Sequence, residues 1–195
     1  IQLYMLTPVR PLSDEEANAL LARLPKGLRE RLARKTGAAR DESLFAYALL
    51  AHALHDRCGW EALPEVAFGA HGKPYFLHAP QLHFNLSHSG RHWLCAFSGA
   101  PVGLDVQQHR ACQKQALARR FFSPAEQAFL ERTSHAPFFD LWCAKESYLK
   151  FTGEGLSGLE AVCTVSPEGG FPSVPGVNLQ LLPLFAGYSA CLCTA

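Results

Sequence analysis

The chain has 195 residues, which is enough for one large domain or two small ones with a buried core. Apolar residues make up 48% of it and charged residues 18%, a composition that excludes a disordered chain and a coiled coil. Lysine and arginine number 18 against 17 aspartate and glutamate residues, so the net charge is +1. A non-specific DNA binder or a polybasic membrane protein carries a larger positive excess, and we therefore expect no nucleic-acid partner and no membrane partner.

The targeting and cysteine signals favour the cytoplasm. No apolar run approaches the roughly 18–20 residues that cross a bilayer, and we expect no signal peptide because residues 1–10 lack a small-residue cleavage site. The seven cysteines are odd in number and contain no C-x-x-C pair, whereas a zinc knuckle needs two clustered pairs. Such cysteines are typical of reduced, buried thiols, so the sequence predicts a cytoplasmic protein.

Helices are expected before strands in the first half of the chain. Ser13-Asp14-Glu15-Glu16 is a capping box and predicts a helix that ends at Pro25. A basic stretch follows over 26–40, and an apolar pattern on nearly all sides predicts a central helix over about 41–57. Short apolar runs between turn signals then predict strands at 66–68, 82–86, 93–97 and 102–106.

The second half repeats this order. The helical period returns weakly from Lys114, and Ser123-Pro124-Ala125-Glu126 is a second capping box with proline at the first helical position. A long helix is expected over 137–150, and strands are expected at 161–165, 177–182 and 188–193. The order of elements therefore predicts an α+β protein with two similar halves, 1–99 and 100–195.

The segment Phe84–Gly90 is the first that could carry chemistry. Ser87 and His88 offer a hydroxyl and an imidazole at a strand end, and a histidine in such a place can act as a base or bind a phosphate. A turn whose serine residues cap backbone amides is the alternative.

The segment Val102–Gln107 is the second. In an alternating strand Asp105 and Gln107 share one face, and two oxygen-bearing side chains there suit Mg²⁺. Gly103 would let backbone or a ligand approach closely. The alternative is a strand end paired with a surface arginine.

The segment Trp142–Lys150 is the third. On a helix Trp142, Lys145 and Glu146 lie on one side, and Lys150 follows Glu146 by four residues. An exposed Glu–Lys pair is the alternative. Together with Lys73 in a Gly-Lys-Pro turn, however, the three segments would equip a site for Mg²⁺-assisted phosphoryl-type transfer.

These motifs carry a resemblance to a known family. Phe-Asn-Leu-Ser-His-Ser-Gly, Val-Gly-Leu-Asp-Val and Trp-x-x-Lys-Glu-Ser-x-x-Lys, in that order and followed by Gly155-Leu156-Ser157, resemble the 4′-phosphopantetheinyl transferases of the surfactin-synthetase type. The resemblance extends from near Arg31 to Ser157. It implies a monomeric pseudo-dimer of two α+β halves, each a small, mostly antiparallel sheet packed with helices, with the active site and coenzyme A in the cleft between them.

The resemblance also implies a reaction. The serine hydroxyl of an apo acyl or peptidyl carrier protein attacks the β-phosphate of coenzyme A, phosphopantetheine is transferred and 3′,5′-ADP leaves. Asp105 and Glu146, with Gln107 as a third candidate ligand, would hold Mg²⁺ on the pyrophosphate. Glu146 is also the candidate base, and Lys150 would pair with the pyrophosphate and assist the leaving group.

Further residues are implied to bind coenzyme A. Ser87 and His88 would contact the nucleotide phosphates, with Lys73 at the adenine and phosphate end. The candidates for the 3′-phosphate pocket are Arg31, Arg40 and Ser43. Lys145 is the candidate for an accessory contact from the long helix.

One departure from the family is expected to matter. Many members have Asp-x-Glu where this chain has Asp105-x-Gln107, so we expect two carboxylates rather than three at the metal, and a lower metal affinity. Two other functions remain open from the sequence: another Mg²⁺-dependent phosphotransferase or a nuclease, and a non-catalytic module that binds coenzyme A or a carrier protein.

Overall fold

A three-stranded antiparallel sheet is present in each of the two units into which the chain divides, Ile1–Gly99 and Ala100–Ala195. The structure is a computed structural model that describes residues 1–155 and 158–195. Leu156 and Ser157 of the predicted Gly-Leu-Ser motif lie outside the described residues. Among the residues described, no helix combines the length and the apolar character needed to cross a bilayer.

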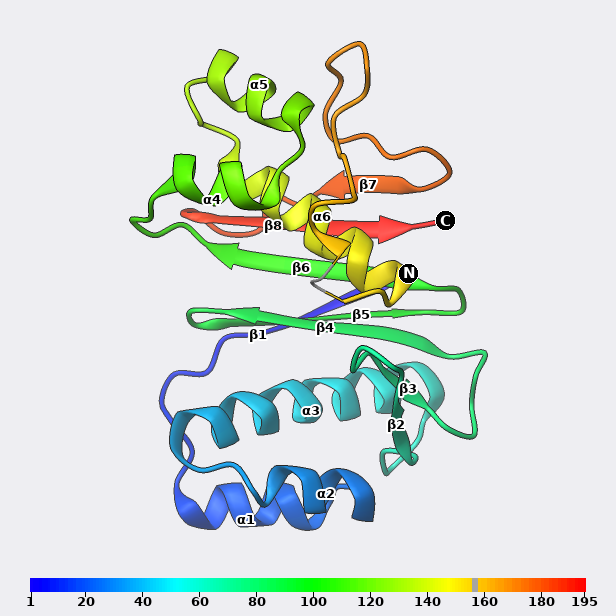
Figure 1. Ribbon diagram of the computed structural model, residues 1–195. Coiled ribbons are helices and arrows are strands. Elements are labelled where there is room, and N and C mark those ends of the chain that lie inside the picture. The colour runs from blue at the N-terminus through cyan, green and yellow to red at the C-terminus, as the bar shows by residue number, and fades with distance from the viewer. Residues whose placement is uncertain (156–157) are drawn as a thin grey trace. The chain divides into compact units, whose positions relative to one another are not determined.

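The first unit packs its longest helix between a sheet and two shorter helices (Figure 1). Its elements are β1 (Gln2–Leu6), α1 (Asp14–Ala22), α2 (Lys26–Leu32), α3 (Gly37–Cys58), β2 (Val66–Phe68), β3 (Pro74–Phe76), β4 (His83–Ser89) and β5 (His92–Ser98). The sheet has the order β1-β5-β4, and β2 and β3 form a separate hairpin. Because α3 contacts all three strands on one side and α1 on another, it is apolar nearly all round, as the sequence predicted.

The second unit has a helix packed directly on its sheet (Figure 1). Its elements are β6 (Val102–Gln108), α4 (Lys114–Phe121), α5 (Pro124–Arg132), α6 (Phe138–Thr152), β7 (Asn178–Leu181) and β8 (Tyr188–Thr194). The sheet has the order β6-β8-β7, and α6 contacts all three strands. Both capping boxes are present, Ser13 with Glu16 ahead of α1 and Ser123 with Glu126 ahead of α5.

The α+β fold class with small antiparallel sheets is confirmed. In each unit the first strand pairs with the last, and the last strand pairs with the one before it. The two units therefore share one strand order and one kind of helix-on-sheet packing. The pseudo-dimer arrangement itself stays a prediction.

One strand was not predicted, and one predicted strand was wrong. Residues 2–6 form β1, which the sequence pattern did not indicate, and the predicted strand at 161–165 does not form. Thr164 donates its backbone N–H to the Glu126 carboxylate, and the Val162 carbonyl accepts from Lys145. Because side chains satisfy these backbone groups, the segment has no need of a neighbouring strand.

Candidate active site on the α6 helix

A close approach between β6 and α6 positions the candidate site of the second unit. A Cβ atom placed on Gly103 would lie 1.9 Å from the Ser147 carbonyl oxygen and 2.5 Å from the Phe151 backbone nitrogen. Only a glycine allows the helix to lie this near to the strand. The predicted close approach at Gly103 is therefore made by helix backbone, and the face of β6 that carries Gly103 and, two residues on, Asp105 is the face that meets α6.

Asp105 and Lys150 form an ion pair across this contact. The Lys150 Nζ lies 2.6 Å from Asp105 Oδ1, and the two side chains are 29% and 7% exposed. Burial alone would lower the pKa of Lys150, but the carboxylates of Asp105 and Glu146 outweigh it, and the net effect is a raised pKa. Lys150 is therefore held as a cation beside the carboxyl groups of Asp105 and Glu146.

Glu146 lies on the same helix one turn before Lys150 and is partly buried. Burial and the neighbouring Asp105 carboxylate raise the pKa of Glu146 to about 7, against the opposing effects of Lys150 and a hydrogen bond from Trp142. A carboxyl group with a pKa in this range can accept a proton near neutral pH and release it again. The three predicted residues Asp105, Glu146 and Lys150 thus come together.

The raised pKa of Glu146 makes a prediction for the metal-free protein. The folded state favours the protonated form, so its contribution to stability is present below about pH 4.5 and is lost as the pH rises through about 7. Glu146→Gln mimics the protonated carboxyl group and removes this loss. We expect the variant to gain stability over the wild type between pH 5 and pH 8, measured by urea unfolding with EDTA. A stability difference that does not change with pH would contradict the assignment.

Lys145, the neighbour of Glu146, does not face this site. Its side chain is fully buried, its Nζ donates to Glu126 Oε2 at 2.7 Å, and it also donates to the Val162 carbonyl. The other Glu126 oxygen accepts from both the backbone N–H and the hydroxyl of Thr164 at 2.9 Å. Lys145 therefore fixes α6 against α5 and the 162–164 segment, and we leave it out of the proposed set of residues that bind coenzyme A.

Gln107 follows Asp105 on the same face of β6, at partial burial. Its side-chain amide donates to the Gln108 carbonyl at 3.3 Å, and across the sheet Gln107 is paired with Ser189. The Ser189 hydroxyl donates to Asp140 of α6 and bonds the His109 imidazole at 2.8 Å. The strand thus places a neutral amide, not a third carboxylate, beyond Asp105.

The chemistry of this donor set fits Mg²⁺. Two carboxyl groups, Asp105 and Glu146, lie close enough for one to raise the pKa of the other, and a divalent cation would relieve that repulsion. Within residues 1–155 and 158–195, no cluster of three or more His, Cys, Asp or Glu side chains is arranged to hold a metal. Mg²⁺ is commonly held by one or two carboxylates, with water and phosphate oxygens as its other ligands, so two carboxylates suffice.

In the first unit, the structure places Ser87 and His88 on β4 rather than in a turn beyond it. As successive residues of a strand they face opposite sides of the sheet, Ser87 buried and His88 exposed. The His88 ring stacks on Trp93, with 5.4 Å between ring centroids, and its Nε2 lies 3.5 Å from a Glu42 carboxylate oxygen. His88 is the member of the pair that is open to a ligand.

The other predicted residues of this unit lie on separate elements. The Arg31 guanidinium stacks 4.2 Å from the centroid of the Phe68 ring, and Arg40 is ion-paired at 3.2 Å with both Asp14 and Asp41. Lys73 lies in the turn between β2 and β3, whose backbone is closed by a hydrogen bond from Gly69 N–H to the Lys73 carbonyl. Since aspartates already balance its charge, Arg40 is a less suitable phosphate ligand than Arg31.

Sequence reasoning missed two residues in these regions. Lys35 donates from Nζ to the Ser43 hydroxyl at 2.8 Å, which makes a cation and a hydroxyl available together. Lys35 lies before α3 begins, so helical periodicity could not place it beside Ser43. Glu126 was identified as a capping residue, but the capping-box pattern gives no sign that its carboxylate also binds Lys145.

Comparisons with known proteins identify the family. A model of the 4′-phosphopantetheinyl transferase superfamily matches residues 101–185. The chain is 34% identical over 168 residues to a 4′-phosphopantetheinyl transferase of Bacillus subtilis, an alignment that covers 80% of this chain and 72% of that protein. The chain belongs to the 4′-phosphopantetheinyl transferase superfamily. It is therefore a member of a superfamily of transferases, as the resemblance implied.

Further members of the superfamily match in the same way. The chain is 31% identical over 165 residues to 4′-phosphopantetheinyl transferase Sfp of Bacillus subtilis strain 168, covering 80% of this chain and 72% of that protein. It is 35% identical over 138 residues to 4′-phosphopantetheinyl transferase AcpT of Escherichia coli O157:H7, covering 68% and 67%. Within the superfamily match at residues 101–185 lie Asp105, Glu146 and Lys150, the three residues that the fold brings together.

Proposed function

We propose that this protein transfers the 4′-phosphopantetheine group of coenzyme A to a serine of an apo acyl or peptidyl carrier protein and releases 3′,5′-ADP. The observation that carries the proposal is the grouping of Asp105, Glu146 and Lys150 between β6 and α6 in a member of this superfamily. In the reaction a bond forms between the serine oxygen and the β-phosphorus, and the bond from that phosphorus to the oxygen of the departing 3′,5′-ADP breaks.

Each of the three residues has a proposed role. Asp105 and Glu146 would hold Mg²⁺, which when bound neutralises charge on the pyrophosphate. Glu146 accepts the proton of the serine hydroxyl, directly or through water, and its pKa of about 7 supports this role. Lys150 pairs with the pyrophosphate oxygens and stabilises the charge that develops on the departing nucleotide.

The partners and the setting are also part of the proposal. Coenzyme A is the co-substrate, and its nucleotide phosphates are contacted by His88 and Ser87, its adenine and phosphate end by Lys73, and its 3′-phosphate by Arg31, Arg40 and Ser43. The protein acts as a monomer in the cytoplasm and needs neither nucleic acid nor a membrane for the reaction. The near-zero net charge and the seven free cysteines support this setting.

The reaction is tested by measuring the intact mass of an apo acyl carrier protein after incubation with this protein, coenzyme A and Mg²⁺. The expected result is a mass gain of one phosphopantetheine group, absent when the acceptor serine of the carrier is replaced by alanine. Glu146→Ala should slow the transfer by about 10²–10⁴-fold. Glu131→Ala, which removes an exposed carboxylate of α5, is the matched control and should leave the rate unchanged. No mass gain on any of several carriers would refute the proposal.

The amide at Gln107 makes a prediction for the metal. Gln107→Glu adds a carboxylate on the face of β6 that carries Asp105, so we expect the Mg²⁺ concentration for half-maximal rate to fall on the order of tenfold. Gln108→Glu, one residue on and on the opposite face, adds the same charge and should leave it unchanged. Rates measured over a Mg²⁺ titration decide the matter. An unchanged Mg²⁺ dependence in Gln107→Glu would show that position 107 is not near the metal.

A further inference from the structure

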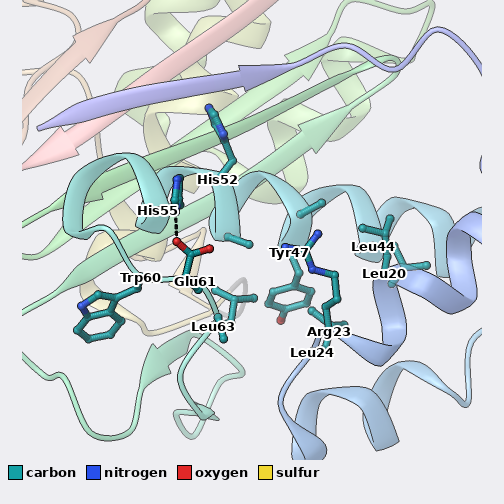
Figure 2. Close-up of a pocket in the computed structure, with 13 residues that line it drawn as sticks. Leu20, Arg23, Leu24, Leu44, Tyr47, His52, His55, Trp60, Glu61 and Leu63 are labelled. Carbon is teal, nitrogen blue, oxygen red and sulfur yellow. Dashed lines mark ion pairs between the residues drawn. The ribbon is translucent and has the colours of Figure 1, made fainter.

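A cavity of about 330 Å³ lies in the first unit, and none of the residues that line it belongs to the proposed active site. Figure 2 shows its walls, which are formed by α1, α3 and the segment that follows α3. This volume falls within the range of sites that hold small organic ligands in proteins. The cavity is therefore large enough for a ligand of its own.

Three buried leucine side chains of the hydrophobic core form the floor of the cavity. These are Leu24, which lies just after α1, Leu44 of α3 and Leu63, and they belong to the core of this unit as well as lining the cavity. Trp60, which lies just after the end of α3, lines it as well and is 39% exposed, a large value for an indole. Apolar walls with one exposed indole favour a ligand with a flat, apolar body.

The polar groups of the cavity that are left without partners are hydrogen-bond donors. Tyr47 is 9% exposed, and its hydroxyl makes no hydrogen bond to the part of the chain that the structure describes. The guanidinium of Arg23 likewise makes no ion pair with any described residue. The carboxylate of Glu61, by contrast, is 3.6 Å from the His55 imidazole, the contact drawn in Figure 2. Neither the Tyr47 hydroxyl nor the exposed Arg23 guanidinium is among the buried groups that lack a partner, so both reach solvent, and a ligand in the cavity could accept hydrogen bonds from them in place of water.

The Tyr47 hydroxyl remains a donor under ordinary conditions. Burial raises the pKa of Tyr47, against a smaller opposing effect of Arg31, so the phenol keeps its proton at neutral pH. A guanidinium is always charged. Between them the two side chains supply a positive charge and a neutral donor, which together suit a carboxylate or a sulfonate.

We propose that this cavity binds a small aromatic anion, with its ring system on the leucine floor and against Trp60 and its acid group at Arg23 and Tyr47. The site is separate from the transferase chemistry, and its existence does not depend on the proposed function. Its ligand class follows from three features together: a cavity of this volume with leucine side chains in its lining, one exposed indole, and two donors that bond to no group in the described chain.

Two fluorescent probes with the same aromatic body test the proposal. 1-Anilinonaphthalene-8-sulfonate carries a sulfonate, and N-phenyl-1-naphthylamine lacks it. We expect saturable binding of the sulfonate, followed by probe fluorescence, and binding of the neutral probe at least fivefold weaker. Arg23→Gln should weaken the sulfonate at least fivefold and leave the neutral probe unchanged. Arg29→Gln, at an exposed arginine outside the cavity, is the matched control for charge.

Filling the cavity distinguishes this site from other apolar surfaces. Ala62→Phe places a ring in the cavity from an exposed loop position, and Ala51→Leu adds bulk from α3, so each should weaken both probes at least tenfold. Circular dichroism verifies that each variant is folded, and Ala62→Phe, being in a loop, keeps the test available if Ala51→Leu does not fold. Binding that survives Ala62→Phe unchanged, or an Arg23→Gln variant that binds the sulfonate as well as the wild type, would overturn the proposal.

Discussion

Lys145→Met is expected to lower the free energy of unfolding by about 3–5 kcal/mol, because it leaves the Glu126 carboxylate buried without its charge partner. Both side chains of this pair are fully buried. Thr164 would still donate two hydrogen bonds to Glu126, but neither donor carries a charge. Methionine keeps the length and the apolar stem of lysine, so the loss reports on the ammonium group rather than on a new cavity.

Urea unfolding of the wild type and the variant measures this effect. Lys26→Met is the matched control, because the Lys26–Glu30 pair is 4.0 Å apart and its side chains are 78% and 63% exposed. An exposed pair of this kind contributes about 0–1 kcal/mol. A second variant, Lys145→Met with Glu126→Gln, removes the buried charge altogether and should recover part of the loss. If Lys145→Met is as mild as Lys26→Met, the buried pair has no structural role.

The pair also matters for the site, since Lys145 directly precedes Glu146 in the sequence. The hydrogen bonds of Lys145 to Glu126 and to the Val162 carbonyl fix how α6 is rotated about its axis. That rotation directs Glu146 and Lys150 toward Asp105. A buried ion pair on one side of the helix thus supports the candidate-site residues on another.

The sequence predicted well those elements whose signal is local. Capping boxes, an all-round apolar helix and strong apolar runs placed α1, α3, α5, α6, β5 and β6 close to their observed bounds. The three residues of the candidate site were also foreseen, because a strand face and a four-residue helical spacing each fix a direction within one element. The family resemblance implied that these residues serve one site, but neither it nor any pattern in the sequence predicted the ion pair between Asp105 and Lys150.

Elements that depend on distant partners were missed. Strand β1 has no fully buried residue and no clear alternation, and it is defined by its pairing with β5, from Gln2 opposite Phe97 to Leu6 opposite Trp93. The segment 161–165 has the composition of a strand, but two of its backbone groups form hydrogen bonds with the side chains of Glu126 and Lys145. Propensity describes a residue and its neighbours, whereas these outcomes depend on which groups from elsewhere in the chain satisfy the backbone.

Gly103→Ala is expected to separate α6 from β6 and so to damage both stability and activity. The new Cβ would lie 1.9 Å from the Ser147 carbonyl oxygen and 2.5 Å from the Phe151 backbone nitrogen, and neither backbone atom can move without the helix. Overpacking of a core typically costs about 1–3 kcal/mol, and a clash with backbone atoms belongs at or above the upper end of that range. We therefore expect a loss of about 3 kcal/mol or more in the free energy of unfolding.

The expected effect of Gly103→Ala on the rate of phosphopantetheine transfer follows from the displacement of α6. Asp105 lies two residues after Gly103 on the same strand face, while Glu146 and Lys150 belong to the helix that is displaced. A shift of about 1 Å between reacting groups can cost on the order of 10²-fold in rate, and we expect a loss of that size at a temperature where the variant is still folded. The matched control is Gly99→Ala, whose Cβ would meet no atom within 4 Å.

Two measurements then separate misplacement from unfolding. Circular dichroism gives the folded fraction of Gly103→Ala, and the carrier mass assay gives the rate per folded molecule. A fall in that rate, together with a higher Mg²⁺ requirement, is the expected result, because the two carboxylates would no longer share one site. If Gly103→Ala is as stable and as active as Gly99→Ala, the contact between α6 and β6 can relax without cost, and the geometry of Asp105, Glu146 and Lys150 does not depend on it.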